Sequence, residues 1–488
     1  MGTIAAVLPY THTNDLFIDG AWTPAEGTGR IQVTNPATEE VWGSVPVASA
    51  ADLDKAVDAA RRAFAGWAAL APSERAPYLL RLAEEIEKRA EPLSHTNTFE
   101  NGSPVAETSR AAANAAGIFR YYASLAGYLE TPDVRPFLDG SAETVVRQDP
   151  VGVCALIAPW NFPINLVVAK LAPALIAGCT VVIKPASPTP LSLRQIVDAA
   201  AAAGIPAGVV NVVTGGGSLG DALVRHRHIA KVAFTGSTPV GRHIAAACGE
   251  LLRPVTLELG GKSSAVVLPD VDLEAMSQVL IRSCMRNTGQ TCYISTRILA
   301  PAARYGELVD MVTATIAAAP QGDPMDPATV FGPAATAAQR DTVRGYIRSG
   351  LEEGARATTG GDVPSGFERG YYVKPTVFAD VRPEMKIARE EIFGPVLSII
   401  RYRDLDEAVQ IANNTGFGLG GTVFSADEEA AFKVAARIDT GSVGLNFFAS
   451  NHTAPFAGRN DSGLGVEFGP EGLHAYLVPQ SVHRRLHR

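Results

Sequence analysis

The side chains best suited to covalent chemistry in this sequence are one cysteine and one glutamate, each close to glycine. Cys292 ends residues 287–292, NTGQTC, where Gly289 permits a close backbone approach and the thiol can face a cleft. Glu258 interrupts an apolar segment that runs into two glycines and Lys262. Because buried carboxylates are rare unless paired or functional, Glu258 is a candidate functional residue. These residues predict nucleophilic catalysis; an incidental loop cysteine and a structural Glu258–Lys262 ion pair are the alternatives.

A third candidate is the side-chain amide of Asn161 in residues 159–163, PWNFP. These residues follow an apolar run that predicts a buried strand, and ligands of open α/β sheets bind at the carboxyl ends of strands. An amide placed there can donate a hydrogen bond to a developing oxyanion. The alternative is a proline-framed turn in which the asparagine is structural.

Two further segments have the composition of a cofactor site. Residues 234–241, FTGSTPVG, connect a predicted strand to a predicted helix, and their backbone N–H groups could hold phosphate oxygens. The spacing is not GxGxxG, and two glycines at this distance often occur by chance. In residues 390–396, EEIFGPV, the two acids could bind ribose hydroxyls and Phe393 could pack beside a ring. Two solvated surface acids explain this segment equally well.

The elements that would position these residues alternate between strands and helices from Val151 onward. Residues 151–157 are apolar without alternation, which indicates a strand buried on both faces. Further strands are predicted at residues 180–183, 209–213 and 231–235, with a helix at 191–203. This order predicts a parallel, right-handed, doubly wound sheet.

The flanking regions contain several predicted helices and one terminal strand. Residues 49–52 resemble a helix-capping box, and apolar residues from Leu53 to Trp67 recur at steps of four and three. The other predicted helices span residues 77–89, 106–129, 304–319 and 405–413. Residues 476–482 predict a strand that projects from the body.

Length and composition limit the classes of function. The chain has 488 residues, enough for two or three domains, and its formal charge of −8 argues against nucleic acid or an anionic membrane as a partner. No secretory signal, myristoylation site or membrane span is expected, since the most apolar stretch contains Lys170, Pro173 and Gly178. The five cysteines form no C-x-x-C pair, so neither a disulfide framework nor a metal site is expected. We expect a cytoplasmic protein.

Taken in order, the five segments resemble the aldehyde dehydrogenase superfamily. Its PWNFP, FTGSxxxG, LELGGK, GQxC and EEIFGPV motifs all occur here in register. Matches at residues 17–20 and 35–36, and at 455–456, 462–463 and 472–473, extend the resemblance over nearly the whole chain. The resemblance implies an enzyme of the non-acylating, hydrolytic type, which oxidises a small-molecule aldehyde to a carboxylic acid with NAD(P).

The resemblance also implies the architecture. The fold would be α/β, with a Rossmann-like cofactor domain, an α/β catalytic domain and a small β oligomerisation arm. These parts would comprise residues 1–130 and 151–259, residues 260–445, and residues 131–150 with 470–488. Residues 446–469 would return to the cofactor domain and the substrate tunnel. Such arms pair between subunits, which predicts a homodimer or homotetramer.

For catalysis, the resemblance implies that Cys292 attacks the aldehyde as a thiolate. The amide of Asn161 and the backbone N–H of Cys292 would hold the oxyanion of the thiohemiacetal. Loss of hydride to the nicotinamide would leave a thioester, and Glu258 would activate the water that hydrolyses it. Glu467 matches a carboxylate often linked to proton relay.

For the cofactor, the resemblance places Lys184 and Glu391 at the adenosine and nicotinamide riboses respectively. It places further residues along the pyrophosphate (Trp160, Gly236, Ser237) and by the nicotinamide (Phe393), and the same motifs include Gly241 and Leu259. NAD-preferring relatives often carry an acid three residues after the lysine, where this chain has Ser187. The missing carboxylate removes a repulsion against a 2′-phosphate, so we expect NAD, with NADP possible.

The aldehyde tunnel that the resemblance implies is apolar. Its lining would consist of Phe162, Leu166, Ala169, Phe447, Phe448 and Phe456. Several of these residues are aromatic and none is charged, which favours an apolar aliphatic or aromatic aldehyde over an acidic semialdehyde. Ala169 is small where many relatives carry a bulky aromatic residue, which indicates a wider tunnel.

Three other interpretations remain. An acylating enzyme would pass the thioester to coenzyme A, but such relatives tend to lack the hydrolytic glutamate. A catalytically silent scaffold would have the same fold, but such relatives typically lose the cysteine or the cofactor pocket. A thiol hydrolase would pair the cysteine with a base, yet no histidine falls in any of the five motifs.

Overall fold

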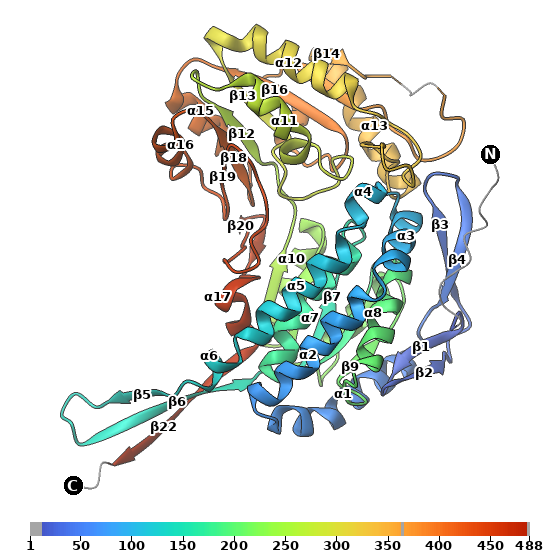
Figure 1. Ribbon diagram of the computed structural model, residues 1–488, viewed down its shortest axis with the longest axis vertical. Coiled ribbons are helices and arrows are strands. Elements are labelled where there is room, and N and C mark those ends of the chain that lie inside the picture. The colour runs from blue at the N-terminus through green and yellow to red at the C-terminus, as the bar shows by residue number, and fades with distance from the viewer. Residues whose placement is uncertain (1–11, 363–365, 486–488) are drawn as a thin grey trace.

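The computed structural model describes residues 12–362 and 366–485. The prediction that no N-terminal signal is present, and the last three residues of the predicted arm, lie outside the described residues. Figure 1 shows two large sheets with their helices as the lower and upper parts of the molecule, and a narrow three-stranded arm that projects from the lower part.

The first sheet has eight strands in the order β2-β1-β9-β8-β7-β10-β11-β21. Its centre is parallel and consists of β9 (Val210–Val212), β8 (Thr180–Lys184), β7 (Val153–Ile157), β10 (Lys231–Thr235) and β11 (Val255–Glu258). Antiparallel strands close the edges, namely β1 (Asp15–Ile18), β2 (Ala21–Pro24) and β21 (Gly463–Leu464). The doubly wound parallel sheet predicted from the apolar runs is confirmed.

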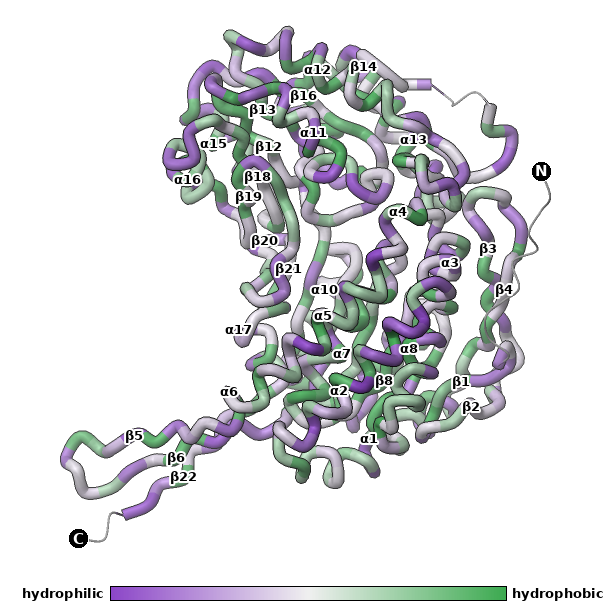
Figure 2. Tube along the Cα trace, in the orientation of Figure 1, coloured by the Kyte–Doolittle hydropathy of each residue, from purple (hydrophilic) through white to green (hydrophobic). Residues whose placement is uncertain are grey.

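Both faces of this sheet are covered by helices. One face packs on α2 (Pro72–Glu87), α5 (Ala111–Ser124), α7 (Pro163–Ala177) and α8 (Leu191–Ala202). The other packs on α1 (Ala50–Ala69), α9 (Gly217–Arg225) and α10 (Thr238–Glu250). In β7, Cys154 and Leu156 face the first group of helices, while Ala155 and Ile157 face the second. Successive strand residues point to opposite faces, so each position must be apolar, and Figure 2 shows these strands as hydrophobic.

Predicted helices agree with the structure where a local capping signal exists. The Ser49 hydroxyl accepts a hydrogen bond from the Asp52 N–H at 3.1 Å, and the Asp52 carboxylate accepts one from the Ser49 N–H at 2.8 Å, which starts α1 as predicted. The helix predicted from Pro77 instead begins at Pro72, which occupies the first helical position that proline favours, and Pro77 lies inside the helix.

The single helix predicted over residues 106–129 is wrong. The structure has α4 (Val105–Thr108), α5 and α6 (Ala126–Glu130) there, and α3 (Ala90–Asn101) precedes them. At the break before α6, the Leu125 N–H bonds to the carbonyl of Tyr122, three residues back, at 3.1 Å. An alanine-rich sequence favours helix throughout and carries no mark of such a break.

The second sheet has seven strands in the order β14-β15-β16-β13-β12-β18-β19. They are β14 (Arg356–Thr359), β15 (Thr376–Ala379), β16 (Val396–Tyr402), β13 (Arg297–Pro301), β12 (Ser264–Val267), β18 (Gly421–Phe424) and β19 (Gly444–Leu445). One face packs on α11 (Leu273–Cys284) and α12 (Tyr305–Ala318). The other packs on α13 (Ala337–Glu352), α14 (Lys386–Arg389), α15 (Leu405–Ala412) and α16 (Glu428–Ala435).

The chain passes from the first sheet to the second between β11 and β12, and returns at β21. Residues 259–263 are therefore the crossing segment, and they hold the two glycines that follow Glu258. The cysteine loop lies between α11 and β13. The division into domains at residue 259 stays a prediction.

The arm consists of β5 (Asp133–Pro136), β6 (Ala142–Pro150) and β22 (Leu477–Arg485), paired antiparallel. The remaining elements are the hairpin of β3 (Arg30–Asn35) and β4 (Glu40–Pro46), the pair β17 (Phe417–Gly418) and β20 (Arg459–Asn460), the short turn η1 (Ala302–Arg304) and α17 (Gly469–His474). Within the described ranges, no helix combines the length and the apolar character needed to cross a membrane.

Candidate active site

The loop that carries Cys292 has an unusual backbone. Asn287, Thr288 and Gly289 have φ values of 52°, 56° and 75°, so three consecutive residues are left-handed. The Gly289 N–H donates to the Met285 carbonyl at 3.0 Å. A Cβ on Gly289 would collide with the carbonyl oxygen of Gly394, so the loop packs directly on the EEIFGPV segment. This packing fixes the loop that presents Cys292.

Cys292 differs from the other cysteines, because it is partly accessible and the other four are buried. It packs beside Tyr293, Leu419 and Phe448. Burial, together with the negative charges of Glu391 and Glu258, raises the pKa of the Cys292 thiol to about 12. The backbone N–H groups of Cys292 and Tyr293 point at the sulfur and oppose this effect. The thiol therefore needs a proton acceptor before it can attack a carbonyl.

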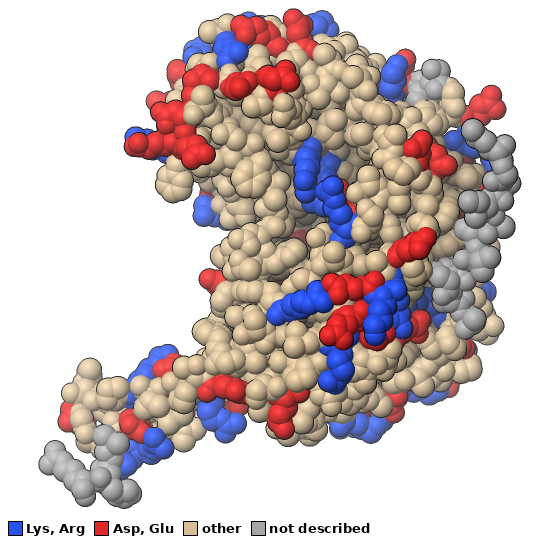
Figure 3. Space-filling model, in the orientation of Figure 1, with Lys and Arg blue, Asp and Glu red and all other residues tan. Residues whose placement is uncertain are grey.

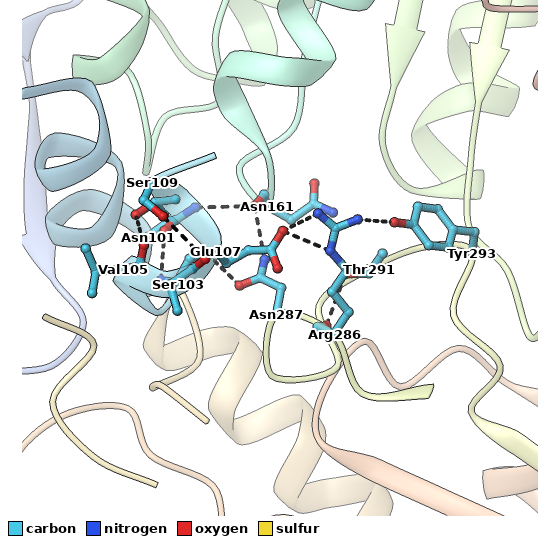
Figure 4. Close-up of polar contacts among 12 residues, drawn as sticks. Asn101, Ser103, Val105, Glu107, Ser109, Asn161, Arg286, Asn287, Thr291 and Tyr293 are labelled. Carbon is cyan, nitrogen blue, oxygen red and sulfur yellow. Dashed lines mark hydrogen bonds and ion pairs between the residues drawn. The ribbon is translucent and has the colours of Figure 1, made fainter. Parts of the chain in front are cut away.

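Asn161 joins the end of β7 to the cysteine loop. Its Nδ2 donates to the Gln290 carbonyl at 3.0 Å. Its backbone carbonyl accepts from the side-chain amides of Asn287 at 3.1 Å and Asn101 at 3.3 Å (Figure 4). The side chain is 3% exposed. One amide hydrogen is used in this contact, so the second is available for a ligand oxygen.

Glu258 ends β11 and is 4% exposed. Neither of its carboxylate oxygens has a hydrogen-bond partner within the part of the chain that the structure describes. Burial raises its pKa well above the usual range, the charge of Glu467 raises it further, and Lys170 opposes them. An unpartnered buried carboxylate is costly, and its raised pKa makes it a stronger proton acceptor than an ordinary glutamate.

Glu467 lies in a buried ion pair behind Glu258. Its Oε1 accepts from Lys170 Nζ at 2.6 Å, and Lys170 also donates to the Thr235 hydroxyl at 2.5 Å. The Lys170 and Glu467 side chains are 0% and 6% exposed. Glu467 thus acts on Glu258 through its charge.

Phe393, predicted by the nicotinamide, contacts Trp160, which was predicted along the pyrophosphate. The rings of Trp160 and Phe393 meet edge to face, with centroids 5.3 Å apart. Glu391 Oε1 accepts from the Gly261 N–H at 2.9 Å, and a Cβ on Gly260 would collide with the same carboxylate. Burial raises the pKa of Glu391 to about 7. The absence of a side chain at Gly260 leaves room for this acid at the crossing segment.

The start of α10 suits a phosphate. Ser237 is the N-cap, its side chain makes no capping hydrogen bond, and the first turn contains no acid. The positive end of the helix is thus free to meet an anion. Gly241 packs against Leu259, where a Cβ would collide, and the Gly236 N–H donates to the Glu258 carbonyl at 3.0 Å.

The other end of the predicted cofactor site lies at β8. Lys184 is 7% exposed, burial lowers its pKa to about 8, and its Nζ donates to the Pro185 carbonyl at 3.3 Å. The Ser187 hydroxyl donates to the Gly215 carbonyl at 3.2 Å. A lysine at the end of β8 and a helix N-terminus after β10 therefore lie at the carboxyl edge of the first sheet, and Glu391, which precedes β16 of the second sheet, reaches the segment after β11. This set fits the riboses and phosphates of a dinucleotide.

The predicted tunnel residues are only partly brought together. Phe448 and Phe456 lie around Tyr293, with ring centroids at 4.7 Å and 6.3 Å. Phe162 and Leu166 are half-buried at the start of α7, whereas Ala169 is 1% exposed and belongs to the helical core. Phe447 is 57% exposed and stands apart from the cluster around Tyr293.

Sequence patterns missed the residues that support the site. Arg286, Glu107 and Tyr293 form one hydrogen-bonded group beside Phe162, and Glu107 is 179 residues from Arg286. Lys170 is 297 residues from Glu467. Tyr293 directly follows the predicted nucleophile and Arg286 directly precedes residues 287–292, so their positions could have indicated a role, whereas Glu107 and Lys170 gave no such signal. Among the described residues, no group of His, Cys, Asp and Glu could hold a metal ion.

Comparison with known proteins identifies the family. The model named "Aldehyde dehydrogenase family" matches residues 22–482. The chain belongs to the aldehyde dehydrogenase family. This confirms the resemblance carried by the five motifs, and with it the predicted α/β fold of an aldehyde dehydrogenase.

Individual aldehyde dehydrogenases match over almost their full length. A geranial dehydrogenase of Castellaniella defragrans is 50% identical over 471 residues, which are 96% of this chain and 98% of that protein. One similar solved structure is aldehyde dehydrogenase C from Pseudomonas syringae, a cysteine-to-alanine mutant in complex with NAD+ and octanal. Its TM-score is 0.93, it is 40% identical to this chain, and the match covers 97% of each chain. An aldehyde dehydrogenase of Mycobacterium tuberculosis with NAD+ has a TM-score of 0.93 and 42% identity, covering 96% of this chain and 97% of that one.

Proposed function

We propose that this protein oxidises an apolar aldehyde to the carboxylic acid with NAD+, through a thioester on Cys292. The observation that carries the proposal is the accessible Cys292 thiol in the same site as the unpartnered carboxylate of Glu258. The similar structures that contain NAD+ support NAD+ as the cofactor. The geranial dehydrogenase and the structure with octanal support an apolar aldehyde as the substrate.

In the first half of the reaction, the Cys292 thiol gives its proton to Glu258 and its sulfur attacks the aldehyde carbon. Because the pKa of Glu258 is raised, its carboxylate is a stronger proton acceptor than an ordinary glutamate. The Cys292 N–H and the second amide hydrogen of Asn161 stabilise the oxyanion. NAD+, when bound, supplies the acceptor for the hydride that leaves the former aldehyde carbon.

In the second half, water attacks the thioester and the bond between carbon and sulfur breaks. Glu258, once deprotonated, takes the proton of that water, and Cys292 leaves as the thiolate. Glu467 and Lys170 act on Glu258 through their charges, because Glu467 raises the pKa of Glu258 and Lys170 lowers it. Glu467 is therefore a positioning residue for proton transfer.

For the cofactor, Lys184, Ser237, Glu391, Trp160 and Phe393 would hold the two riboses, the pyrophosphate and the nicotinamide. Ser187 presents a hydroxyl bonded to the Gly215 carbonyl, so no acid repels a 2′-phosphate at that position, and we propose that NADP is also accepted. We further propose a homodimer or homotetramer in which the arm pairs between subunits. The cytoplasmic location stays a prediction.

The test is reduction of NAD+ by purified protein with octanal, in the absence of coenzyme A. Wild type should form NADH and Cys292→Ala should form none. Cys284→Ala is the matched control, because it removes a fully buried thiol on α11 and should remain active. Turnover by Cys292→Ala, or an absolute need for coenzyme A, would contradict the proposal.

A further inference from the structure

A mostly buried ion pair lies beside the catalytic cysteine loop, and the mechanism above does not use it. Arg286 Nε donates to Glu107 Oε1 at 2.9 Å, and Arg286 Nη2 donates to the same oxygen. The two side chains are 19% and 18% exposed. Arg286 lies in the loop after α11 and Glu107 on α4, so the pair joins segments far apart in the chain (Figure 4).

Arg286 connects this pair to Tyr293, the neighbour of Cys292, and to Phe162, which was expected in the aldehyde tunnel. Its Nη1 donates to the Tyr293 hydroxyl, and its guanidinium carbon lies 5.1 Å from the centre of the Phe162 ring. Tyr293 follows Cys292 directly and stacks on Phe448 at 4.7 Å. The guanidinium therefore lies at the hydroxyl end of the Tyr293 ring, opposite the end joined to the backbone beside the nucleophile.

The position of Arg286 relative to Cys292 is fixed by the loop itself. The Arg286 carbonyl accepts from the Thr291 hydroxyl at 3.1 Å and from the Gly289 N–H at 3.1 Å. The tail of an aldehyde bound at Cys292, extending along Tyr293, would thus reach the Arg286–Glu107 pair.

The charges of the pair cancel as long as both side chains are present. In surroundings of low polarity, an unpaired charge acts strongly on any ligand nearby. With Glu107 in place, Arg286 already has its carboxylate partner, and an acidic tail would compete with it. Without Glu107, the guanidinium would be free to bind a carboxylate.

We propose that Arg286 and Glu107 form a charge-compensated end wall of the aldehyde pocket, and that Glu107 prevents Arg286 from accepting aldehydes with a carboxylate tail. This inference rests on the proposed function, and it makes the preference for apolar aldehydes depend on a neutralised pair of charges.

The test compares aldehydes of matched length whose tails end in a methyl, a carboxylate or a trimethylammonium group. Glu107→Gln should raise kcat/KM for the carboxylate tail, relative to the methyl tail, by about tenfold or more. Arg286→Met should shift preference the opposite way, towards the cationic tail, by a similar factor. The double variant, which has neither charge, should return to the wild-type order.

The matched control is the exposed pair of Arg120 and Glu87, whose closest atoms are 2.6 Å apart and whose side chains are 44% and 41% exposed. Glu87→Gln and Arg120→Met remove the same charges away from the pocket and should leave all three ratios unchanged. If Glu107→Gln does not fold, Glu107→Asp retracts the carboxylate by one methylene and should shift the ratio in the same direction by less.

The inference is overturned if both single variants change the three tails alike, or shift preference in the same direction. It is also overturned if the variants match wild type while remaining folded, as judged by Tm. Failure of the proposed function would look different, because wild type would then oxidise none of the three aldehydes.

Discussion

At the scale of single residues, the site combines two acids whose pKa values are both shifted upward by burial. Glu258 is ready to take a proton, and the Cys292 thiol, with a pKa of about 12, needs such a partner. The contiguous motifs point to Cys292, Glu258 and Asn161 from the sequence, and the roles of these residues stay a prediction. The contacts of Glu107 with Arg286 and of Lys170 with Glu467 could not be predicted, because folding brings together segments that are far apart in the sequence.

The rate of thioester hydrolysis should depend on pH through Glu258. Only its deprotonated form accepts a proton, and its pKa is raised, so the rate should fall as pH decreases through a value well above the usual 4.5. Glu467→Gln removes a charge that raises this pKa, so the acidic limb should move to lower pH. Single-turnover measurement of hydrolysis against pH tests this. An unchanged limb, or one at higher pH, would contradict it.

Removal of one partner leaves Lys170 buried without its carboxylate, so Glu467→Gln should also lower the free energy of unfolding by about 3–5 kcal/mol. Denaturant titration measures this cost. The pH profile is therefore recorded well below the Tm of the variant, so that the shift of the limb reports the pKa of Glu258 and not unfolding.

Glu391 should control the affinity for NAD+ in a pH-dependent way. Its pKa is raised to about 7, so below that pH the carboxyl becomes protonated and the KM for NAD+ should rise. Glu391→Gln should raise the KM for NAD+ by about tenfold, because a hydrogen bond to a charged acceptor is lost. The same variant should abolish the pH dependence of this KM. Steady-state kinetics across pH measures both effects. Persistence of the dependence in the variant would assign it to another group.

At the scale of elements, sequence patterns identified strands buried on both faces and the helix with a capping box. They failed at residues 106–129, where an alanine-rich stretch is interrupted at Leu125. They could not show that the cysteine loop is left-handed at three consecutive positions, since Asn287 and Thr288 adopt that backbone only in the folded context.

Gly289→Ala tests the importance of the loop backbone. The left-handed φ of 75° and the collision with the Gly394 carbonyl should lower stability by about 1–3 kcal/mol and reduce kcat by displacing Cys292. Gly345→Ala in α13 is the control, because a Cβ there meets nothing within 4 Å and should stabilise the helix slightly. Tm and kcat are measured for both. Wild-type behaviour of Gly289→Ala would show that the loop tolerates displacement.

At the scale of the whole molecule, two helix-covered sheets meet at the site and the arm projects away from them. On the face shown in Figure 3, basic and acidic side chains lie intermixed, including those on the arm. The arm exposes several apolar side chains, namely Val134, Phe137, Leu138, Val478 and Val482. Such a surface on a narrow sheet favours association with another subunit.

The assembly should therefore depend on the arm. A variant with Val478→Glu and Val482→Glu places charges on this exposed strand and should shift the protein to a smaller species. Light scattering after size-exclusion chromatography measures the mass. Leu80→Glu on α2, 43% exposed in wild type, is the control and should leave the mass unchanged. A smaller species in the control alone would place the interface elsewhere.

The most direct test of the central claim is mass spectrometry of Glu258→Gln after a single turnover with octanal and NAD+. The account predicts about one equivalent of NADH and an octanoyl group on the peptide that contains Cys292, since hydrolysis is slowed by about a hundredfold or more. Wild type should show little of this adduct and Cys292→Ala none. NADH formed in Glu258→Gln at the wild-type steady-state rate, with no acyl group on Cys292, would contradict the account.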